Sequence, residues 1–377
     1  MKIGIVLHPY DEDKPAGLGR TIFELVRAML QIDEKNEYII FVKNKPRKKP
    51  RFPGKNWQLH VLGEGLLWLD RLRSAPRADV YIFNTPVLPL FWRPPKSIVI
   101  VLDFAYRYLP TKGIVPFVKN MMLGWYHGVC LRRADHIVSI SETTKKEVIK
   151  LYKIPKDKIT VVYLGYNKIC VLEEKKINVP QKFFLFVGVL KDRKNPFSVI
   201  KAFVEFYKKH KDFKLVVAGR GGGPYYHAMV RYAKDHNAEN AVVFLGFVSD
   251  EQLSFLYKRA YAFVFPSLFE GGFALPIFES MDCGVPVIAS GKGPYESMEE
   301  TVGDAGILVD PLNISQITSA MERLAEEAGL REEFIKKGFE HVKKFSWRKT
   351  GEEMLKVVSR LESNSNPDTP MHPNNPD

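Results

Sequence analysis

The residues best suited to chemistry lie between residues 265 and 281. This segment reads FPSLFEGGFALPIFESM, in which an apolar run gives way to a glycine-containing loop and then to a helix that begins near Leu275 or Pro276. The first N–H groups of a helix have no intrahelical partner, so they could hold an anion in the loop. Glu279, about one turn into the helix, could accept two hydrogen bonds from the vicinal hydroxyls of a ribose. Alternatively, Glu279 would only complement the dipole of the helix, without binding a ligand. For Glu270 the alternative is an exposed acidic residue of the loop with no function.

A second candidate lies at residues 186–196, FVGVLKDRKNP, where a strand again leads through a loop to a helix. Arg193 and Lys194 come just before this helix, where a cation is unfavourable for the helix itself. A bound anion would resolve that conflict, because Arg can grip a diphosphate through two parallel bonds and Lys adds a point charge. An ordinary surface pair of basic residues remains the alternative.

Two further patterns near the amino terminus are weaker indications of a functional site. Gly17 and Gly19, in AGLGR, follow the first apolar run but form only a fragment of a dinucleotide fingerprint. No acidic residue follows where a dehydrogenase would bind the ribose, which disfavours nicotinamide chemistry. The acidic run at residues 11–13 precedes the glycine loop and is interpreted as a solvated loop rather than a metal site. The nine histidines show no zinc-binding spacing, so no metal is predicted.

Short apolar runs alternate with helix-length amphipathic segments along the chain. This alternation is typical of parallel sheets that are covered by crossover helices, and it therefore predicts a doubly wound α/β fold. We expect strands at residues 2–7, 38–42, 80–83, 97–101, 136–139, 183–187, 214–218, 242–245, 262–265 and 285–289. We expect helices at residues 18–31, 115–133, 142–152, 197–210, 225–236, 251–258 and 275–282.

The pattern is interrupted once and then restarts, which predicts two domains. Residues 1–170 would form the first, 171–181 a linker and 182–345 the second. Residues 346–362 would be a last helix that could cross back to the first domain. Residues 363–377, rich in Pro, Asn and Ser, should be disordered. Two doubly wound domains in tandem would place a ligand-binding cleft between them.

The basic excess is confined to the first domain. Residues 1–170 carry 29 Lys and Arg against 15 Asp and Glu, whereas the remainder carries 27 against 28. Six basic residues lie in residues 43–51, and residues 114–133 combine aromatic and Met side chains with Arg132 and Arg133. Basic clusters beside aromatics predict contact with an anionic membrane surface, with a core helix and solvated lysines as the alternative. No nucleic-acid-binding motif accompanies the charge, so nucleic acid is not an expected partner.

The three cysteines, Cys130, Cys170 and Cys283, are far apart and odd in number. That pattern argues against a disulfide framework and predicts three unpaired thiols in a reducing compartment. The first ten residues lack a signal-peptide apolar region, and no apolar run reaches the length of a membrane span. We therefore expect a cytoplasmic protein that can lie on the inner face of the membrane.

Taken together and in order, these segments resemble a known family, the GT-B glycosyltransferases of glycosyltransferase family 4. The similarity rests on residues 186–195, 215–221 (LVVAGRG), 244–253 (FLGFVSDEQL), 265–289 and 301–311 (TVGDAGILVDP), and more loosely on residues 17–20 and 136–145 (HIVSISETTK). The resemblance implies two Rossmann-like domains that face a cleft, the first on the acceptor side and the second for a nucleotide sugar.

The resemblance also implies roles for individual residues. Glu279 would hold the ribose, and Arg193 and Lys194 would neutralise the diphosphate. The catalytic residues would be Asp103, Glu270, Arg193 and Lys194. The further donor-binding residues would be Gly17, Gly19, Phe247, Val248, Gly272, Phe273, Ala274 and Leu275. No metal and no other cofactor would be needed, because cationic side chains and a helix amino terminus stabilise the leaving diphosphate.

Two departures from the family pattern concern the catalytic residues. Glu270 and Glu279 have eight residues between them, whereas the family usually has seven. Leu102 precedes Asp103 at a position where the family tends to have histidine. A mechanism that uses this histidine as a base is therefore disfavoured, whereas front-face substitution assisted by the leaving phosphate is not.

The resemblance implies a retaining, metal-independent hexosyltransferase. Mannose from GDP-mannose is the first choice of donor, and the acceptor would be a lipid-linked or growing glycan in polysaccharide or cell-envelope biosynthesis. Two alternatives remain open: a non-catalytic module that binds a sugar nucleotide or polysaccharide, and a sugar-nucleotide epimerase. A thermal-shift screen with nucleotides and their sugars would separate donors by their stabilisation.

Overall fold

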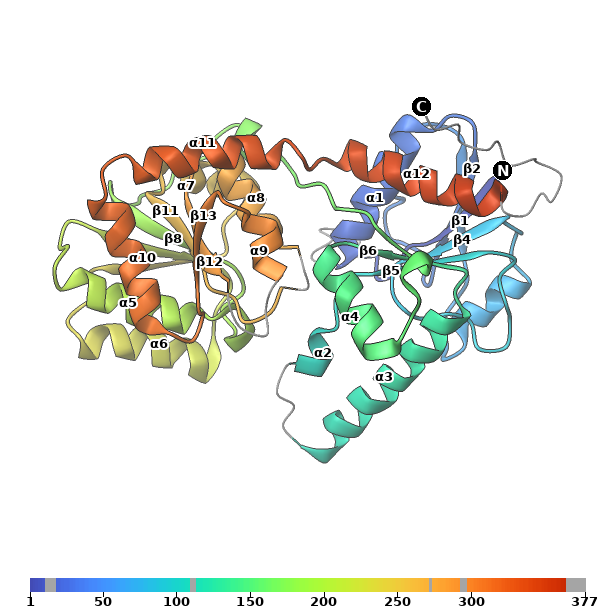
Figure 1. The fold of residues 1–377 in the computed structure, drawn as a ribbon, viewed down its shortest axis with the longest axis horizontal. Coiled ribbons are helices and arrows are strands. Elements are labelled where there is room, and N and C mark those ends of the chain that lie inside the picture. Colours follow the sequence, from blue (N-terminus) through green and yellow to red (C-terminus); the bar gives the residue numbers. More distant parts are fainter. Residues whose placement is uncertain (11–17, 109–112, 271–272, 292–296, 364–377) are drawn as a thin grey trace, which may run out of the picture. The chain divides into compact units, whose positions relative to one another are not determined.

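The structure is a computed structural model that describes residues 1–10, 18–108, 113–270, 273–291 and 297–363. Within these ranges the chain divides into two compact units (Figure 1). The first comprises Met1–Leu102, Thr111–Gly165 and Ser346–Asp377, and the second Asp103–Pro110 and Tyr166–Phe345. The boundary thus follows Gly165, and residues 171–181 group with the second unit.

The first unit is built on a parallel sheet of seven strands in the order β3-β2-β1-β4-β5-β6-β7. Apart from the first residues of β1, β2 and β6, its central strands are buried, which explains why apolar runs revealed them. The two edge strands β3 and β7 were not predicted, because most of their residues are exposed or only partly buried. The strands are β1 (Lys2–Val6), β2 (Glu37–Val42), β3 (Trp57–Val61), β4 (Val80–Phe83), β5 (Ser97–Val101), β6 (His136–Ser139) and β7 (Ile159–Val161).

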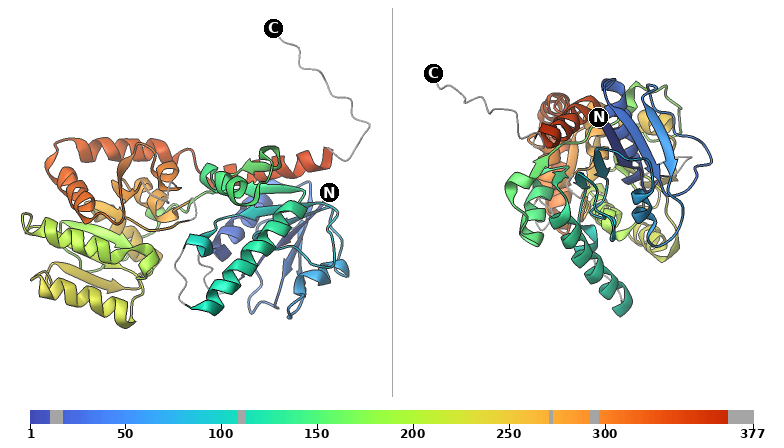
Figure 2. Two further views of the ribbon diagram at one scale, coloured as in Figure 1. Left: turned by 60° about the horizontal axis from the view of Figure 1, so that its bottom comes forward. Right: turned by 90° about the vertical axis from the view of Figure 1, so that its right-hand side faces the viewer.

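Helices cover this sheet, and one of them comes from the end of the chain. The helix α12 (Trp347–Ser363) packs against α1 (Leu18–Ile32), where Gly351 allows close approach to the backbone of Ala28 (Figure 1). The first half of α3 (Ile114–Arg133) extends away from the sheet of its own unit (Figure 2). The remaining elements of this unit are α4 (Glu142–Tyr152), which is capped by Ser141, and the short 3-10 helices η1 (Trp68–Arg73) and η2 (Lys156–Lys158).

The second unit is built on a parallel sheet of six strands in the order β10-β9-β8-β11-β12-β13. The strands are β8 (Phe183–Val187), β9 (Lys214–Ala218), β10 (Val242–Gly246), β11 (Ala262–Phe265), β12 (Val287–Ser290) and β13 (Gly306–Val309). The helices are α5 (Pro196–Tyr207), α6 (Gly223–Asp235), α7 (Asp250–Arg259), α8 (Leu275–Asp282), α9 (Ser297–Val302), α10 (Ile314–Glu326) and α11 (Leu330–Val342). Short helical turns occur at α2 (Ala105–Tyr108), η3 (Ile169–Val171) and η4 (Asp192–Lys194). The prediction of two doubly wound parallel sheets is therefore confirmed.

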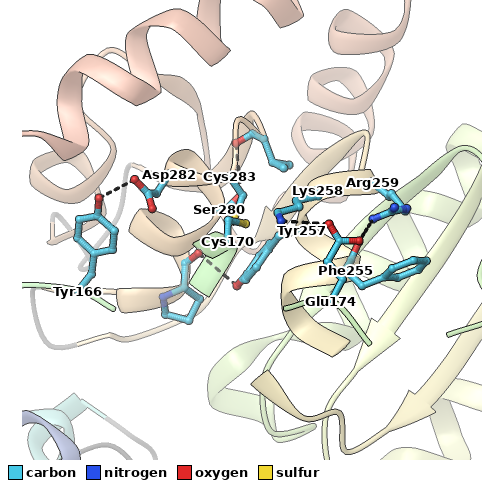
Figure 3. The surroundings of a disulfide bond; sticks show 12 residues. Tyr166, Cys170, Glu174, Phe255, Tyr257, Lys258, Arg259, Ser280, Asp282 and Cys283 are labelled. Carbon is cyan, nitrogen blue, oxygen red and sulfur yellow. Dashed lines mark hydrogen bonds and ion pairs between the residues drawn. A yellow bond between two sulfur atoms is a disulfide. The ribbon is translucent and has the colours of Figure 1, made fainter. Parts of the chain in front are cut away.

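The prediction of three unpaired cysteines is wrong for two of them. Cys170 in η3 and Cys283 at the end of α8 form a disulfide, with 5.6 Å between their Cα atoms (Figure 3). The two lie 113 residues apart in the sequence, and the fold brings them together, which their number and spacing could not reveal. Cys130 is free and buried. Cysteine usage consequently gives no support to a reducing compartment.

The segment around the disulfide is fastened to the second unit by further contacts. The hydroxyl of Tyr166 donates to Asp282 at 2.9 Å, and Glu174 pairs with Lys258 at 3.0 Å and with Arg259 at 2.7 Å (Figure 3). These contacts attach the segment to α7 and α8. Glu174 thus ties the predicted linker to the second unit, with which residues 171–181 group.

Candidate functional site

The candidate site lies at the carboxyl edge of the six-stranded sheet. There β8 lies between β9 and β11, so the connections from β8 and β11 leave in different directions at a topological switch point. Ligands of doubly wound sheets bind outside the carboxyl ends of strands at such points. The loop after β8 carries Arg193 and Lys194, and the loop after β11 carries Glu270 and leads to α8.

Lys194 and Glu270 form a buried ion pair across these two loops. The Nζ atom of Lys194 donates to both carboxylate oxygens of Glu270, and the two side chains are 16% and 8% exposed. The hydroxyl of Ser267 donates to the same carboxylate. Two candidates that lie 76 residues apart in the sequence are therefore brought into direct contact.

Burial lowers the pKa of Lys194, and the neighbouring charges act on it in both directions. The carboxylate of Glu270 raises this pKa, Arg193 lowers it, and Asp103 makes a smaller contribution that raises it. A buried lysine keeps its proton only while negative charge lies beside it. Glu270 supplies this charge, and since the pair has no net charge, Arg193 gives this edge the positive charge that suits an anionic ligand.

Hydrogen bonds to backbone carbonyl groups join the loop after β8 to the loop after β11. The side-chain amide of Asn195 donates to the carbonyl oxygens of Pro266 and Pro311 at 2.9 and 2.7 Å, and the N–H of Leu268 donates to the carbonyl of Arg193 at 2.8 Å. Asn195 adopts a left-handed backbone conformation with φ of 57°, which asparagine tolerates better than most residues, and Pro196 then begins α5. Sequence reasoning missed Asn195, although Asn-Pro after two basic residues could have indicated such a turn.

The amino terminus of α8 presents backbone donors at this edge. Ala274, the residue before the helix, makes no side-chain capping bond, and Pro276 lies in the first turn. Phe273 and Ala274 are buried, so the contribution expected from them is that of the backbone. An uncapped helix terminus favours an anion. Gly272 lies outside the described residues.

Glu279 lies in α8 and is 6% exposed. Burial raises the pKa of Tyr257 well above its usual value, and the negative charge of Glu279 adds a smaller increase. The Tyr257 hydroxyl donates to the carbonyl of Pro276 at 3.3 Å, so it remains a neutral donor beside the carboxylate. A buried carboxylate one turn from an anion-binding terminus is well placed to accept ribose hydroxyls.

A pocket of about 510 Å³ is lined in part by the loop after β8. Its lining includes Arg193, Arg220, Gly221 and Tyr225. The guanidinium of Arg220 lies 4.8 Å from the ring centre of Phe247, which is 57% exposed. Burial raises the pKa of Tyr225 to about 12. A planar cation beside an exposed ring is a surface on which a flat base could stack.

The backbone approaches itself closely next to this pocket, at the residues that precede Val189 and Arg220 of its lining. A Cβ atom on Gly219 would lie 1.8 Å from the carbonyl oxygen of Gly188, so the chain requires glycine there. Val248 follows Phe247 directly after β10 and is half-buried. Sequence reasoning did not select Arg220 or Tyr225, although Arg220 lies within the LVVAGRG segment.

The other predicted site residues come from segments outside these two loops and α8, or lie outside the described residues. Gly19 lies in the first turn of α1 in the first unit, and Gly17 and residues 11–13 are outside the described residues. Asp103 belongs to the short segment that groups with the second unit, and its carboxylate accepts from the N–H of Ala105 at 2.8 Å. The ring of Tyr108 in the same segment stacks on Phe269 at 5.3 Å.

Comparisons with known proteins assign the family. The family described as Glycosyl transferases group 1 matches residues 171–341, and the family described as Glycosyltransferase Family 4 matches residues 15–168. Together they account for most of the chain and reach both units. The chain therefore belongs to the GT-B glycosyltransferases of family 4, as its motifs predicted.

One curated relative and two solved structures illustrate the similarity. The chain is 27% identical over 361 residues to O-antigen chain mannosyltransferase B of Escherichia coli, covering 88% of this chain and 92% of that protein. Its fold is similar to that of sucrose-phosphate synthase from Thermosynechococcus elongatus, with a TM-score of 0.74 at 17% identity, covering 96% and 99% of the two chains. Anabaena HepE in complex with UDP gives a TM-score of 0.74 at 14% identity, covering 96% and 100%.

Proposed function

We propose that this glycosyltransferase is a retaining, metal-independent enzyme that transfers a hexose from a nucleotide sugar to a glycan. The donor is GDP-mannose by first choice, and the acceptor is a lipid-linked or growing chain in polysaccharide or cell-envelope biosynthesis. The name of the relative from Escherichia coli, an O-antigen chain mannosyltransferase, supports both the sugar and the kind of acceptor. UDP in the structure of HepE supports a nucleoside diphosphate as the leaving group.

The single observation that carries the proposal is the buried pair of Lys194 and Glu270 at the switch point. Glu270 of this pair lies in the loop that leads to the uncapped amino terminus of α8, and Lys194 lies in the loop after β8. Arg193 and Lys194 would hold the diphosphate while α8 donates backbone N–H groups and Glu279 accepts from the ribose. Fixed positive charge at the place where negative charge develops lowers the barrier for departure of the diphosphate.

The bond changes follow from this arrangement. The bond between the anomeric carbon and the diphosphate oxygen breaks while an acceptor hydroxyl attacks the same face of the sugar. The departing phosphate oxygen takes the proton of that hydroxyl, so no separate protein base is needed. Leu102, which occupies the position of the family histidine, has no group that could serve as a base.

The membrane surface enters the proposal through α3. From residue 114 to residue 125 of α3 six large apolar residues are 60–81% exposed: Ile114 (81%), Val115 (79%), Phe117 (61%), Met121 (60%), Met122 (64%) and Trp125 (72%). Monomeric proteins rarely leave so many large apolar residues together in water. With the basic excess of residues 1–170, this face fits the interface of an anionic membrane, where a lipid-linked acceptor would be found. Among the described residues, no helix is long and apolar enough to cross a bilayer.

The experiment that tests the proposal measures transfer of labelled sugar from GDP-mannose and UDP-glucose to lipid-linked glycans, with the anomeric configuration of the product determined by NMR. We expect Lys194→Ala to abolish transfer, whereas the control Lys208→Ala, which loses an exposed pair with Glu205, should keep it. Binding of nucleotide sugars without transfer or hydrolysis would identify a binding module instead. Conversion of the donor without any acceptor would identify an epimerase.

A further inference from the structure

A pocket of about 720 Å³ lies in the first unit at the amino-terminal edge of its sheet. Its charged lining is Arg93, Arg132, Arg133, Asp135, Asp157 and Lys158. His136 also lines it and begins β6, while Lys158 comes immediately before β7. The catalytic edge of a doubly wound sheet is the carboxyl edge, which strands of this length place about 15 Å away. The pocket is thus distinct from the donor site, and the inference does not rest on the proposed function.

Positive charge in this pocket is only partly balanced. Asp135 accepts from the N–H and the hydroxyl of Ser97, each at 2.8 Å, and lies 3.6 Å from Arg93. Its negative charge is thereby already engaged within the protein. Asp157, the other acid of the lining, is exposed. The four cations of the lining outnumber the two acids, and Arg360 adds a further positive charge nearby, since it contributes to lowering the pKa of His136.

Backbone carbonyl groups orient these cations without neutralising them. Arg133 donates to the carbonyl of Pro89 at 3.1 Å, and Lys158 donates to the carbonyl of Arg132 at 2.8 Å. Arg132 and Arg133 also lie in the last turn of α3, where cations complement the helix dipole. That role does not explain Arg93 and Lys158, which come from other segments.

The pKa shifts of Lys158 and His136 agree with an excess of positive charge in this pocket. Burial lowers the pKa of Lys158, and Arg93 lowers it further against the opposing effect of Asp135. Burial likewise lowers the pKa of His136, with Arg360 and Lys158 adding to the effect. The titratable groups at this edge are thus exposed to a positive field, which an anion would relieve.

We propose that this pocket is a second anion site that binds a phosphate group. The volume lies in the range of small-molecule sites, about 300–1,000 Å³. The planar guanidinium groups of Arg93, Arg132 and Arg133 are suited to paired hydrogen bonds with phosphate oxygens, and Lys158 supplies a point charge. Free phosphate compounds and lipid headgroups share this chemistry, and the test separates the two sources.

The test measures binding of inorganic pyrophosphate by calorimetry in a background that carries Arg193→Ala and Lys194→Ala, so that the donor site does not contribute. Adding Arg93→Ala and Lys158→Ala should weaken the remaining binding at least about tenfold, because two charged hydrogen-bonding groups are lost. The matched control adds Lys146→Ala and Lys150→Ala, which remove the same charge from exposed positions of α4. Arg93→Ala alone, at a side chain 72% exposed, tests the site without risk to folding.

A second arm measures co-sedimentation of the same variants with vesicles that contain phosphatidic acid. A loss of affinity confined to pyrophosphate assigns the site to a soluble phosphate compound, and a loss that includes the vesicles assigns it to a lipid headgroup. Either result supports the site. The proposal is overturned if both arms are unchanged, or if the α4 control weakens binding as much as the pocket variant does.

Discussion

The Nζ atom of Lys194 donates to both carboxylate oxygens of Glu270, although the two residues come from different loops of the same sheet edge. Breaking a buried ion pair leaves a charge without a partner, which is costlier than the pair itself is stabilising. Glu270 therefore has a role that does not require contact with a substrate: it keeps a proton on a lysine whose pKa burial would otherwise lower further.

Glu270→Gln should lower both the stability and the alkaline limit of activity. The free energy of unfolding should fall by about 3–5 kcal/mol, measured by urea titration, because Lys194 loses its buried partner. Since Glu270 raises the pKa of Lys194, the substitution should move the alkaline limb of the kcat/KM profile to lower pH. Glu205→Gln, at the exposed pair with Lys208, is the control for both measurements. An unshifted alkaline limb would exclude this role for Glu270.

Glu279→Gln should weaken nucleotide binding without unfolding the chain. The substitution keeps the shape of a residue that is 6% exposed and removes the charge that, in the proposed function, would accept hydrogen bonds from the ribose. Hydrogen bonds to a charged group contribute about 1.5–3 kcal/mol, so the Kd of the nucleotide should rise by roughly 10- to 150-fold. Calorimetry would measure it, with Glu340→Gln at an exposed pair of α11 as the control. A Kd equal to that of the control would refute the ribose assignment.

Much of the fold could be predicted because most residues of the central strands are apolar. Residues 80–83, 97–101, 183–187, 214–218 and 262–265 were predicted with the bounds that the structure has, as was α8. Strands β3, β7 and β13 were missed because their burial is partial, so apolar runs do not reveal them. Local patterns also carry no information on contacts between distant residues, which is why the disulfide was missed.

The candidate site could be predicted in part from local sequence motifs. Arg193, Lys194, Glu270 and Glu279 were selected because their local motifs place them at strand ends and at a helix start. Asn195 and Ser267 were not selected, since their role depends on carbonyl groups and a carboxylate that only the folded sheet brings near. The direct contact between Lys194 and Glu270 follows from the adjacency of β8 and β11, which the order of strands in the sequence does not show.

The exposed face of α3 should govern binding to anionic vesicles. Phe117→Ser with Trp125→Ser removes two large side chains that are 61% and 72% exposed, so each loses roughly 2 kcal/mol of transfer free energy if it inserts into the interface. Vesicle affinity should then fall by two to three orders of magnitude in a sedimentation assay. Leu312→Ser, at a residue 69% exposed in the second unit, is the control. Equal affinity of the variant and the control would remove α3 from the membrane contact.

Reduction of the disulfide should destabilise the second unit. Cys170 and Cys283 close a loop of more than one hundred residues, and a disulfide typically contributes about 2–4 kcal/mol through restriction of the unfolded chain. A dithiol reductant should therefore lower the Tm of the wild type, and Cys170→Ser with Cys283→Ser should lower it equally. The reductant should have no further effect on this double variant. A reductant effect that persists in the double variant would place its cause elsewhere.

Buried histidines should make the protein less stable as the pH falls below 6.5. His341 is 8% exposed, and burial lowers its pKa, although a hydrogen bond to the carbonyl of Thr301 at 2.9 Å opposes the shift. The unfolded chain therefore takes up a proton near pH 6.5 that the folded chain refuses until a lower pH. The stability contributed by the neutral ring is present above pH 6.5 and is lost as the pH falls towards the lowered pKa of the folded state. Below that pKa no further stability is lost through His341. His341→Gln keeps a donor for Thr301 and removes the titration, so its free energy of unfolding should change less between pH 7.5 and pH 5 in urea titrations. Parallel pH profiles for the two proteins would show that His341 does not contribute to the acid sensitivity.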